Sequence, residues 1–456
     1  MPATSQPLAA SPADQESTPL RRSVGTWALF LFILGDVLGA GVYVLVGEVA
    51  GTAGGAVWVP LLAALLLALL TAGSYAELAT KYPRAGGSSH YAQRAFGDVV
   101  GFLVGFCMLA AGIVSVGALS LGFAGDYLAE FVRLPVPLVV TVFLGLLAAL
   151  NLRGIKESMG TNAVATVIEV SGLLLILALG IVVMARGGAD LTRLTQLGTA
   201  EHGPVGAVLA ASVLAFYSYV GFETSVNLAE EASDPSRSYP RALFGALAVA
   251  GLIYVGVGVA ASAILPTDEL AASSGPLLEV VRTAGGVPPV LFSLVALVAV
   301  ANGALLTGIM SSRLAYGMAR DGLLPSVLGR VLPGRQTPWV AILVTTALSL
   351  LLALTGEVAT LASTLVLLLL VVFASTNLAV LALRRDRVAH SHFRVPSILP
   401  VLGLVSCLVL ATRVEASTWR LGLPLLVAGA LLALVAAHRN RRATPQQVDQ
   451  SSTSEN

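Results

Sequence analysis

Charged side chains are scarce in this chain, and their scarcity is the first indication of its class. Asp, Glu, Lys and Arg make up 11% of the 456 residues, whereas soluble domains carry about 25%. The mean hydropathy is +0.86, and apolar runs of about 20 residues, the length of a membrane-crossing helix, recur throughout. The sequence therefore predicts an all-α integral membrane protein. The short alternating segments of a membrane β-barrel are missing.

Residues that carry metal, redox or nucleotide chemistry are also few. The two cysteines, Cys107 and Cys407, lie in apolar runs and predict no disulfide framework. The five histidines fall in predicted loops or at span ends, so no metal or other cofactor is expected. The sequence has no G-x-x-x-x-G-K-[ST] motif for ATP, and its net charge of +1 gives no indication of nucleic acid as a partner. No nucleophile–base pair shares one membrane level, so an enzyme is not predicted.

The apolar runs predict twelve transmembrane helices. They cover residues 24–50, 54–79, 97–125, 136–152, 161–186, 204–231, 239–265, 287–317, 337–355, 358–384, 396–412 and 420–438. The two ends of the chain, residues 1–23 and 439–456, are polar and are predicted to be disordered tails.

The basic residues predict which side of the membrane each loop occupies. With the N-terminus inside, 20 of the 26 Lys and Arg residues fall on the cytoplasmic side and 6 fall outside. The outer six are Arg133, Arg186, Arg193, Arg282, Arg413 and Arg420. This asymmetry follows the positive-inside rule. We therefore expect a multi-pass protein of the plasma (inner) membrane with both termini in the cytoplasm.

The first predicted span contains residues that do not suit an uninterrupted helix. At mid-span it has three glycines and one acid: Gly35, Gly39, Gly41 and Asp36. Each glycine costs about 1 kcal/mol relative to alanine, and a carboxylate at the bilayer centre costs at least about 2.5 kcal/mol. Broken backbone at this depth is tolerated only inside protein or beside a cavity. The alternative is close helix packing through the G-x-x-x-G spacing of Gly35 and Gly39.

The sixth span is interrupted in a similar way. Residues 215–223, A-F-Y-S-Y-V-G-F-E, place a serine, a glycine and an acid at mid-span. Interruptions at equivalent positions of two five-span halves are typical of an inverted repeat with its ligand site at the membrane midplane. The predicted units are residues 24–187, residues 204–384 and a final pair of spans at 396–438. This correspondence favours a binding site in the first span over simple packing.

Four motifs carry a family resemblance. They are L-G-A-G-V-Y-V-L-V-G at 38–47, A-E-L-A-T-K-Y-P-R-A-G-G-S-S-H-Y-A-Q-R-A-F-G-D at 76–98, A-E-E-A-S-D-P-S-R-S-Y-P-R-A at 229–242 and S-R-L-A-Y-G-M-A-R-D-G-L-L-P at 312–325. Together they resemble the amino acid–polyamine–organocation (APC) superfamily of transporters, and look most like its cationic amino acid transporter branch and bacterial relatives. The resemblance covers about residues 24–440. It implies a LeuT-like 5+5 inverted repeat with helices 1 and 6 broken at mid-membrane.

The resemblance also implies a substrate site built from both interruptions. Backbone amides at the start of a half-helix suit a carboxylate, and carbonyls freed by the interruptions suit an amino group. Tyr217 matches an aromatic residue that shields the substrate from the outside in relatives. The implied amides are those of Gly39, Ala40 and Gly41, and the implied carbonyls those of Val37, Leu38, Phe216 and Val220. The whole predicted set is Asp36, Val37, Leu38, Gly39, Ala40, Gly41, Phe216, Tyr217, Ser218, Val220, Gly221 and Thr307.

Three residues are predicted to take part in ion coupling. Many relatives carry a lysine at the position of Glu169, near the sodium site of the sodium-coupled branch, and a carboxylate there can bind a proton or sodium. Burial in a membrane disfavours the charged form, which favours a proton. The resemblance places Asn302 near the same site. The alternative is a permanently protonated Glu169 bonded to Asn302. Glu223 matches a recurrent acid that either holds the half-helices together or takes part in proton-linked gating, and the alternative is a purely structural hydrogen bond.

Asp36 departs from the family pattern, because relatives tend to have a small polar residue there. It either binds a second amino group of a cationic substrate or polyamine, caps the half-helix that follows, or pairs across the bundle. Ala111 stands where cationic-branch members carry an acid in the third span, which argues against transferring their specificity.

These features predict a secondary active amino acid transporter that works by alternating access as a proton symporter. One alternative is a sodium-coupled or exchange carrier for polyamines or other amines. Another is a non-transporting amino acid sensor on the same fold. The expected partners are an amino acid or amine substrate and membrane lipid, with H+ or Na+ as the coupling ion.

Overall fold

The elements of the described part of the chain are helices. The computed structural model describes residues 25–83, 86–154, 159–199, 203–230 and 232–443. Seven helices are long and apolar enough to cross a membrane, and the bent pair α1 (Thr26–Val37) and α2 (Gly41–Ala53) brings the number to eight. The seven are α3 (Trp58–Lys81), α5 (Asp98–Phe123), α8 (Met159–Ala185), α10 (Pro235–Ile264), α13 (Pro289–Arg320), α15 (Val358–Leu383) and α17 (Ala416–Ala443). The chain is a multi-pass membrane protein.

Four shorter apolar helices occupy the remaining predicted spans. They are α7 (Val136–Leu152), α9 (Pro204–Tyr217), α14 (Trp339–Thr355) and α16 (Ile398–Ala411). At the C-terminal end, α17 continues to Ala443, beyond the predicted end of the last span at residue 438. The rest of the two predicted tails lies outside the described residues, as do Arg21, Arg22, Arg84 and Lys156 of the charge count and Glu231 of the third motif.

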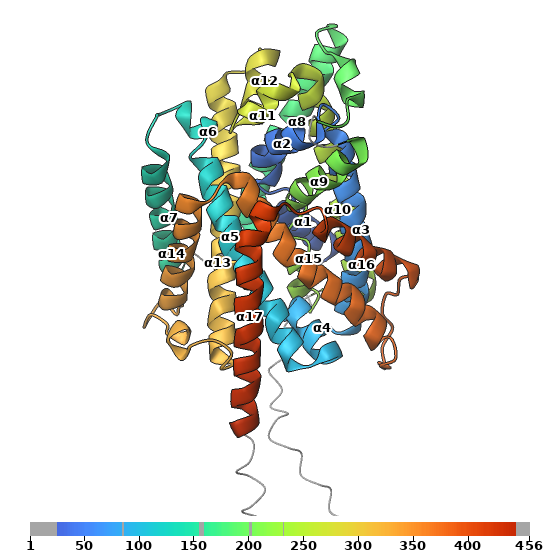
Figure 1. Ribbon diagram of the computed structural model, residues 1–456, viewed down its shortest axis with the longest axis vertical. Helices are drawn as coiled ribbons and strands as arrows, with labels where there is room; N and C mark the ends of the chain where they lie inside the picture. The colour runs from blue at the N-terminus through green and yellow to red at the C-terminus, as the bar shows by residue number, and fades with distance from the viewer. Residues whose placement is uncertain (1–24, 84–85, 155–158, 200–202, 231, 444–456) are drawn as a thin grey trace, which may run out of the picture.

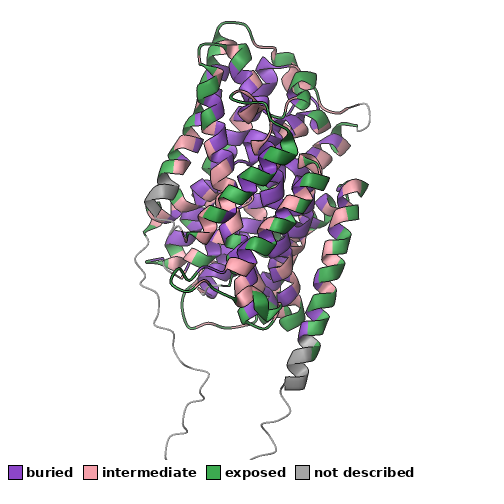
Figure 2. Ribbon diagram, turned by 90° about the vertical axis from the view of Figure 1, so that its left-hand side faces the viewer, coloured by how far each residue is buried: buried purple, intermediate pink, exposed green. Residues whose placement is uncertain are grey.

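Short helices in the loops, which the sequence did not predict, cover the two ends of the bundle. Figure 1 shows α6 (Asp126–Ala129), α11 (Thr267–Ala272) and α12 (Pro276–Ala284) at the end where α2 lies. At the opposite end, α4 (Gly87–Phe96) lies below α15. Figure 2 shows that buried residues fill the middle of the bundle, while many outward-facing positions are exposed. Exposed residues include leucines such as Leu252 and Leu146, as expected of a surface that faces lipid.

The interruption predicted in the first span is confirmed. The axes of α1 and α2 differ by 46° across the residues that separate them. The glycines divide into two roles. A Cβ at Gly35 would lie 2.2 Å from the Thr166 hydroxyl oxygen, so Gly35 permits close packing against α8. A Cβ at Gly39 would meet only the Asp36 carbonyl oxygen, at 3.5 Å, so the packing explanation applies to Gly35 alone.

The sixth predicted span is an α-helix only in its first half. After α9 ends at Tyr217, the chain forms turns and the five-residue 3-10 helix η3 (Thr224–Leu228). Gly221 has a φ of +125°, which interrupts any helix. The Ser225 hydroxyl donates to the Phe222 carbonyl oxygen at 2.5 Å. Such local side-chain bonds compete with helical hydrogen bonding, so the second half-helix that the sequence predicts is replaced by tighter turns.

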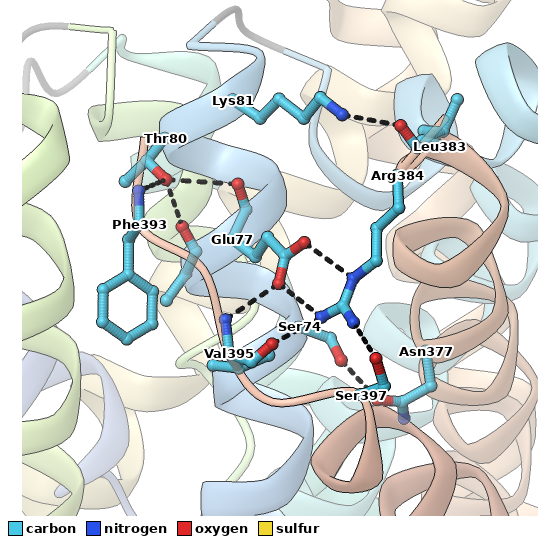
Figure 3. Close-up of polar contacts among 11 residues, drawn as sticks. Ser74, Glu77, Thr80, Lys81, Asn377, Leu383, Arg384, Phe393, Val395 and Ser397 are labelled. Carbon is cyan, nitrogen blue, oxygen red and sulfur yellow. Dashed lines mark hydrogen bonds and ion pairs between the residues drawn. The ribbon is translucent and has the colours of Figure 1, made fainter. Parts of the chain in front are cut away.

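A buried polar network joins α3 to the end of α15 (Figure 3). The Arg384 guanidinium donates to both carboxylate oxygens of Glu77, at 3.0 and 2.8 Å. The Glu77 side chain is 1% exposed and that of Arg384 12%. The Val395 amide also donates to Glu77 at 2.9 Å, and Ser74 donates to the Asn377 amide oxygen at 2.6 Å. Helix α3 and the end of α15 are therefore fixed to each other by oriented contacts as well as by packing.

Candidate functional site

A cavity of about 390 Å³ lies where the two interruptions meet. Its wall is formed by the α1–α2 turn, the segment after α9, and faces of α5, α8, α13 and α15. Thirteen of the fifteen predicted site residues line it, and Ala111 does so as well. The exceptions are Leu38 and Phe216, which are buried but are not among the lining residues. The structure thus brings residues from positions 36 to 307 into one chamber.

The first turn of α2 offers backbone donors to this cavity. No side chain caps the N-terminus of α2, and the first N–H groups of an α-helix lack partners within the helix. Gly39, Ala40 and Gly41 all line the cavity at this point. The positive end of the helix dipole adds to the amides in favouring an anion, so the geometry suits a carboxylate at the start of α2.

Substitution of two of these glycines by alanine should have different consequences. A Cβ at Gly41 would lie 2.9 Å from the Ser218 backbone, so Gly41→Ala is expected to destabilise the fold by about 1–3 kcal/mol. Gly39→Ala has room in the fold, but its methyl group would occupy the open side of Gly39, which is the cavity. It is expected to weaken ligand binding by about tenfold or more with little change in thermal stability. Ligand titration and melting curves of both purified variants measure this contrast. Equal loss of stability in the two variants would contradict it.

Two carbonyls predicted to hold an amino group already accept hydrogen bonds. The Tyr254 hydroxyl donates to the Val37 carbonyl oxygen at 2.6 Å. The Tyr219 amide donates to the Phe216 carbonyl oxygen at 3.0 Å. A carbonyl oxygen has two lone pairs, so Val37 keeps one acceptor position, whereas the Ser218 amide also points to the Phe216 carbonyl oxygen. Tyr254 nevertheless restrains Val37, and it ties the end of α1 to α10.

Glu223 forms a hydrogen bond within the second interruption. Its carboxylate accepts the Gly221 amide at 2.9 Å, and the side chain is 3% exposed. This contact holds the turn after α9 in shape. Among the three readings of Glu223, this contact corresponds to the structural hydrogen bond, and Glu223 also lines the cavity.

Asp36 links the two interruptions to each other. The Thr224 hydroxyl, at the start of η3, donates to an Asp36 carboxylate oxygen at 2.5 Å. A Cβ at Gly221 would lie 2.7 Å from the Asp36 carbonyl oxygen, so the two chain segments also touch through their backbones. Among the three roles predicted for Asp36, the contact with Thr224 corresponds to pairing across the bundle.

Glu169 combines complete burial with an unpaired oxygen. Its side chain is 0% exposed. One carboxylate oxygen accepts the Asn302 amide at 3.0 Å, as the predicted proximity of these residues requires. The other oxygen, Oε2, has no hydrogen-bond partner among the described residues. The Tyr43 hydroxyl fixes the backbone by donating to the Glu169 carbonyl oxygen at 2.6 Å. A buried carboxylate charge is costly unless it is paired, so a bound proton, which neutralises it, or a bound cation, which pairs with it, lowers that cost.

Tyr217 and Ser115 meet across one end of the cavity. Their hydroxyl oxygens lie 3.0 Å apart, and both residues are buried. The cavity-lining residues of α5 run from Gly105 to Leu119, and Ser115 lies toward the end nearer α2. Tyr217 and Ser115 are therefore in contact in the wall of the cavity, on its side nearer α2.

The cavity extends in the opposite direction, toward α4. Its wall includes Gly86, Gly87 and Ser89 at the start of α4, Asn227 of η3 and Arg313 near the end of α13. The chamber thus has a polar extension at the α4 end and the Tyr217–Ser115 contact at the other.

Sequence reasoning missed several residues of this site. Ser115 lies four positions after Ala111 in α5, so the two share a helix face, and this spacing was an available signal. Thr224 directly follows Glu223, but no local pattern indicates that it reaches Asp36. The apolar wall from α15, Leu365 and Leu369, is not distinguishable in sequence from core positions.

Comparisons with known proteins identify the family. The sequence profile described as "Amino acid permease" matches residues 24–420. An uncharacterized transporter of Mycobacterium tuberculosis is 32% identical over 445 residues, which is 96% of each chain. The branched-chain amino acid permease BcaP of Bacillus subtilis is 26% identical over 89% of this chain and 90% of its own. The low-affinity putrescine importer PlaP of Escherichia coli is 28% identical over 88% of this chain and 91% of its own.

The match to the family profile and the full-length relatives agree with the fold and the central cavity. The protein is a membrane transporter of the permease type and not an enzyme. It belongs to the amino acid permease family of the APC superfamily, as its motifs predicted, and it has relatives among plant cationic amino acid transporters.

Proposed function

We propose that the protein is a secondary active transporter of amino acids, driven by symport of a proton and working by alternating access. All twelve apolar segments cross the membrane in this proposal, including the four shorter helices. The first ten form the 5+5 inverted repeat. The observation that carries the proposal is the cavity itself, which joins both interruptions to a buried carboxyl with one unpaired oxygen.

The substrate's two charged groups match the two interruptions. Its carboxylate binds the amides at the start of α2, and its ammonium group binds the remaining lone pairs of Val37 and neighbouring carbonyls. The wall opposite the α1–α2 turn receives the side chain of the substrate. It includes Met108, Ala111, Leu306, Leu365 and Leu369.

In this proposal the structure represents the inward-facing state. The protein lies in the plasma (inner) membrane, and the positive-inside rule places the α4 end and both termini in the cytoplasm. The cavity extends to that end, and Tyr217 with Ser115 separates the substrate from the outside. The helices of spans 1, 2, 6 and 7 rock against those of spans 3, 4, 8 and 9 to reach the outward-facing state.

Glu169 carries the coupled proton. Protonation removes its buried charge, and deprotonation leaves that charge with the Asn302 amide as its one side-chain hydrogen-bond partner among the described residues. Loading and release of the proton therefore change the electrostatics beside the substrate amides. An amine or polyamine is the second candidate substrate class, because the carboxylate of Asp36 stands in the cavity wall and one relative is a putrescine importer.

Uptake into proteoliposomes tests the proposal. The full chain is reconstituted and offered a panel of labelled amino acids and amines, with and without an inward proton gradient. We expect an amino acid to accumulate only when the gradient is present. Flux that is independent of the gradient and requires substrate on the far side of the membrane would show that the protein is an exchanger and not a symporter. Uptake that depends on a sodium gradient would show that sodium, and not the proton, is the coupling ion. Substrate binding without any flux would support a sensor.

A further inference from the structure

Lys81 is a buried cation that has no carboxylate partner among the described residues. It is the last residue of α3 and is 4% exposed. Its ammonium group donates to the Leu383 carbonyl oxygen at 2.6 Å (Figure 3), and so caps the C-terminus of α15. An ammonium group has three donors, and this is the one hydrogen bond that Lys81 makes with the described residues. Burial of a charge is costly unless the charge is paired.

The two acids nearest to Lys81 in the fold are committed to other cations. Glu77, one turn earlier in α3, binds Arg384 through both oxygens. Asp386 binds Arg94 at 2.7 Å and accepts the Tyr82 hydroxyl. These contacts, above all the one from Arg94, hold the pKa of the Asp386 carboxyl below its ordinary value. Neither carboxylate pairs directly with Lys81, and Lys81, Arg94 and Arg384 outnumber the two acids, so this cluster keeps an excess positive charge.

Lys81 lines a second pocket, of about 460 Å³. Its wall consists of Lys81, Tyr82, Pro83, His90, Arg94, Val388, Ala389 and His390. Four of these eight side chains are basic and none is acidic. They come from three separate segments: the end of α3, the outer face of α4 and the loop after α15. A pocket rich in donors, beside a buried cation without an acid, suits an anion with several acceptor oxygens.

The pocket lies at the end of two membrane-crossing helices, where lipid headgroups are found. Basic pockets between helix ends on the cytoplasmic side of a membrane are suited to phosphate-bearing headgroups. The neighbouring Val388 and Ala389 provide an apolar edge. The same pocket chemistry would also accept a free phosphate, so the chemistry common to both sources is a phosphate-bearing anion.

The helix α4 connects this pocket to the transport cavity. Gly87 and Ser89 line the cavity, whereas His90 and Arg94 line the basic pocket. An anion that binds one face of this ten-residue helix restrains its other face. By linkage, any change that the anion makes in substrate binding is matched by an equal effect of substrate on anion binding.

We propose that the pocket formed by Lys81, His90, Arg94 and His390 is a regulatory site for a phosphate-bearing anion, and that its occupant positions α4 at the mouth of the cavity. The anion can bind to this site whatever the transported substrate is. Its effect on transport rests on the proposed function.

Binding is tested on the purified full chain in a neutral detergent. The probes are dioctanoyl phosphatidylglycerol, dioctanoyl phosphatidylcholine and inorganic phosphate, each titrated while the melting temperature is followed. We expect phosphatidylglycerol to raise the melting temperature and phosphatidylcholine to leave it unchanged. Lys81→Gln and His390→Gln should weaken binding about tenfold, because the first replaces a charged donor by a neutral amide and the second takes an imidazole ring out of the pocket wall. Arg330→Gln, which removes an exposed arginine outside the pocket, is the matched control and should not weaken it.

The other possible outcomes of the binding experiment either support the site or refute it. Binding of inorganic phosphate with the same sensitivity to the variants, and none of phosphatidylglycerol, supports the site with a free anion as occupant. If Lys81→Gln does not fold, because α15 loses its cap, His390→Gln carries the test. If no probe binds, or if binding is indifferent to His390→Gln, the site is refuted.

A second measurement separates this inference from the proposed function. Substrate flux is compared in vesicles of phosphatidylcholine alone and in vesicles that also contain phosphatidylglycerol. We expect flux to depend on the anionic lipid in the wild type and in Arg330→Gln, and to lose that dependence in His390→Gln. Absence of flux in every vesicle would count against the transport function while binding of the anion still held. Equal lipid dependence in His390→Gln would refute the regulatory role.

Discussion

Replacement of Glu169 by glutamine should abolish proton-driven accumulation of substrate while leaving exchange of substrate intact. Glutamine keeps the oxygen that accepts the Asn302 amide, and it adds an NH2 group where Oε2 has no partner. The variant therefore resembles the protonated, loaded state permanently. A carrier that can no longer release a proton equilibrates its substrate but does not concentrate it.

The expected magnitude follows from the driving force. A gradient of one pH unit is worth about 1.4 kcal/mol, so a one-proton symporter reaches about tenfold accumulation. For Glu169→Gln we expect a ratio near one at the same gradient, with a rate of counterflow exchange that no longer varies with pH. Accumulation and counterflow in proteoliposomes measure the two quantities separately.

The matched control is Glu48→Gln, which removes another acid from a membrane-crossing segment. Glu48 lies in α2 but is not among the residues that line the cavity. Its variant should retain accumulation. If Glu169→Gln still concentrates substrate in response to the gradient, Glu169 does not carry the coupled proton.

Removal of Arg384 should produce the largest loss of stability. Arg384→Met leaves the Glu77 carboxylate, which is 1% exposed, with the Val395 amide as its one remaining hydrogen-bond donor among the described residues. Breaking a buried ion pair from one side costs about 3–5 kcal/mol, because the remaining charge is uncompensated. The free energy of unfolding by sodium dodecyl sulfate should fall by about this amount.

Two further variants distinguish an unpaired charge from lost packing. The double variant Glu77→Gln with Arg384→Met removes both charges and should recover most of the lost stability. Arg94→Gln breaks the more exposed pair with Asp386, whose side chains are 46% and 36% exposed, and should cost less than about 1 kcal/mol. A double variant as unstable as Arg384→Met would show that the guanidinium acts mainly through packing and its contacts with Val395 and Ser397.

Hydrophobicity was sufficient to predict the positions of the long helices. Each of the twelve apolar runs contains a helix in the structure, seven or eight of them long enough to cross a membrane, and the ends of α7 coincide with the predicted residues 136–152. The helices α4, α6, α11 and α12 escaped prediction because they are short, lie in loops and are stabilised by contacts distant in sequence. Asp126 of α6, for example, accepts the amide of Ser274, far along the chain. The shape of the second interruption also depended on local turn contacts that hydropathy does not record.

The parts of the candidate site that could be predicted are those whose backbone conformation requires particular residue types in the sequence. Glycines and an acid at mid-span indicated the first interruption, and the break after Tyr217 had similar signals. The partners across the cavity had none, because a contact such as Thr224 with Asp36 joins residues 188 positions apart. Only the folded chain shows that Asp36 engages the second interruption and that Oε2 of Glu169 lacks a partner.

The contact between Tyr217 and Ser115 has a consequence for the balance of conformations. A hydrogen bond of this kind contributes about 0.5–1.5 kcal/mol, which corresponds to roughly a tenfold change in a population ratio at most. In the transport cycle proposed above, a gate held by this contact alone is stabilised only modestly. The two orientations of the proposed carrier can then have comparable free energies, so small differences in substrate or proton binding decide which one predominates.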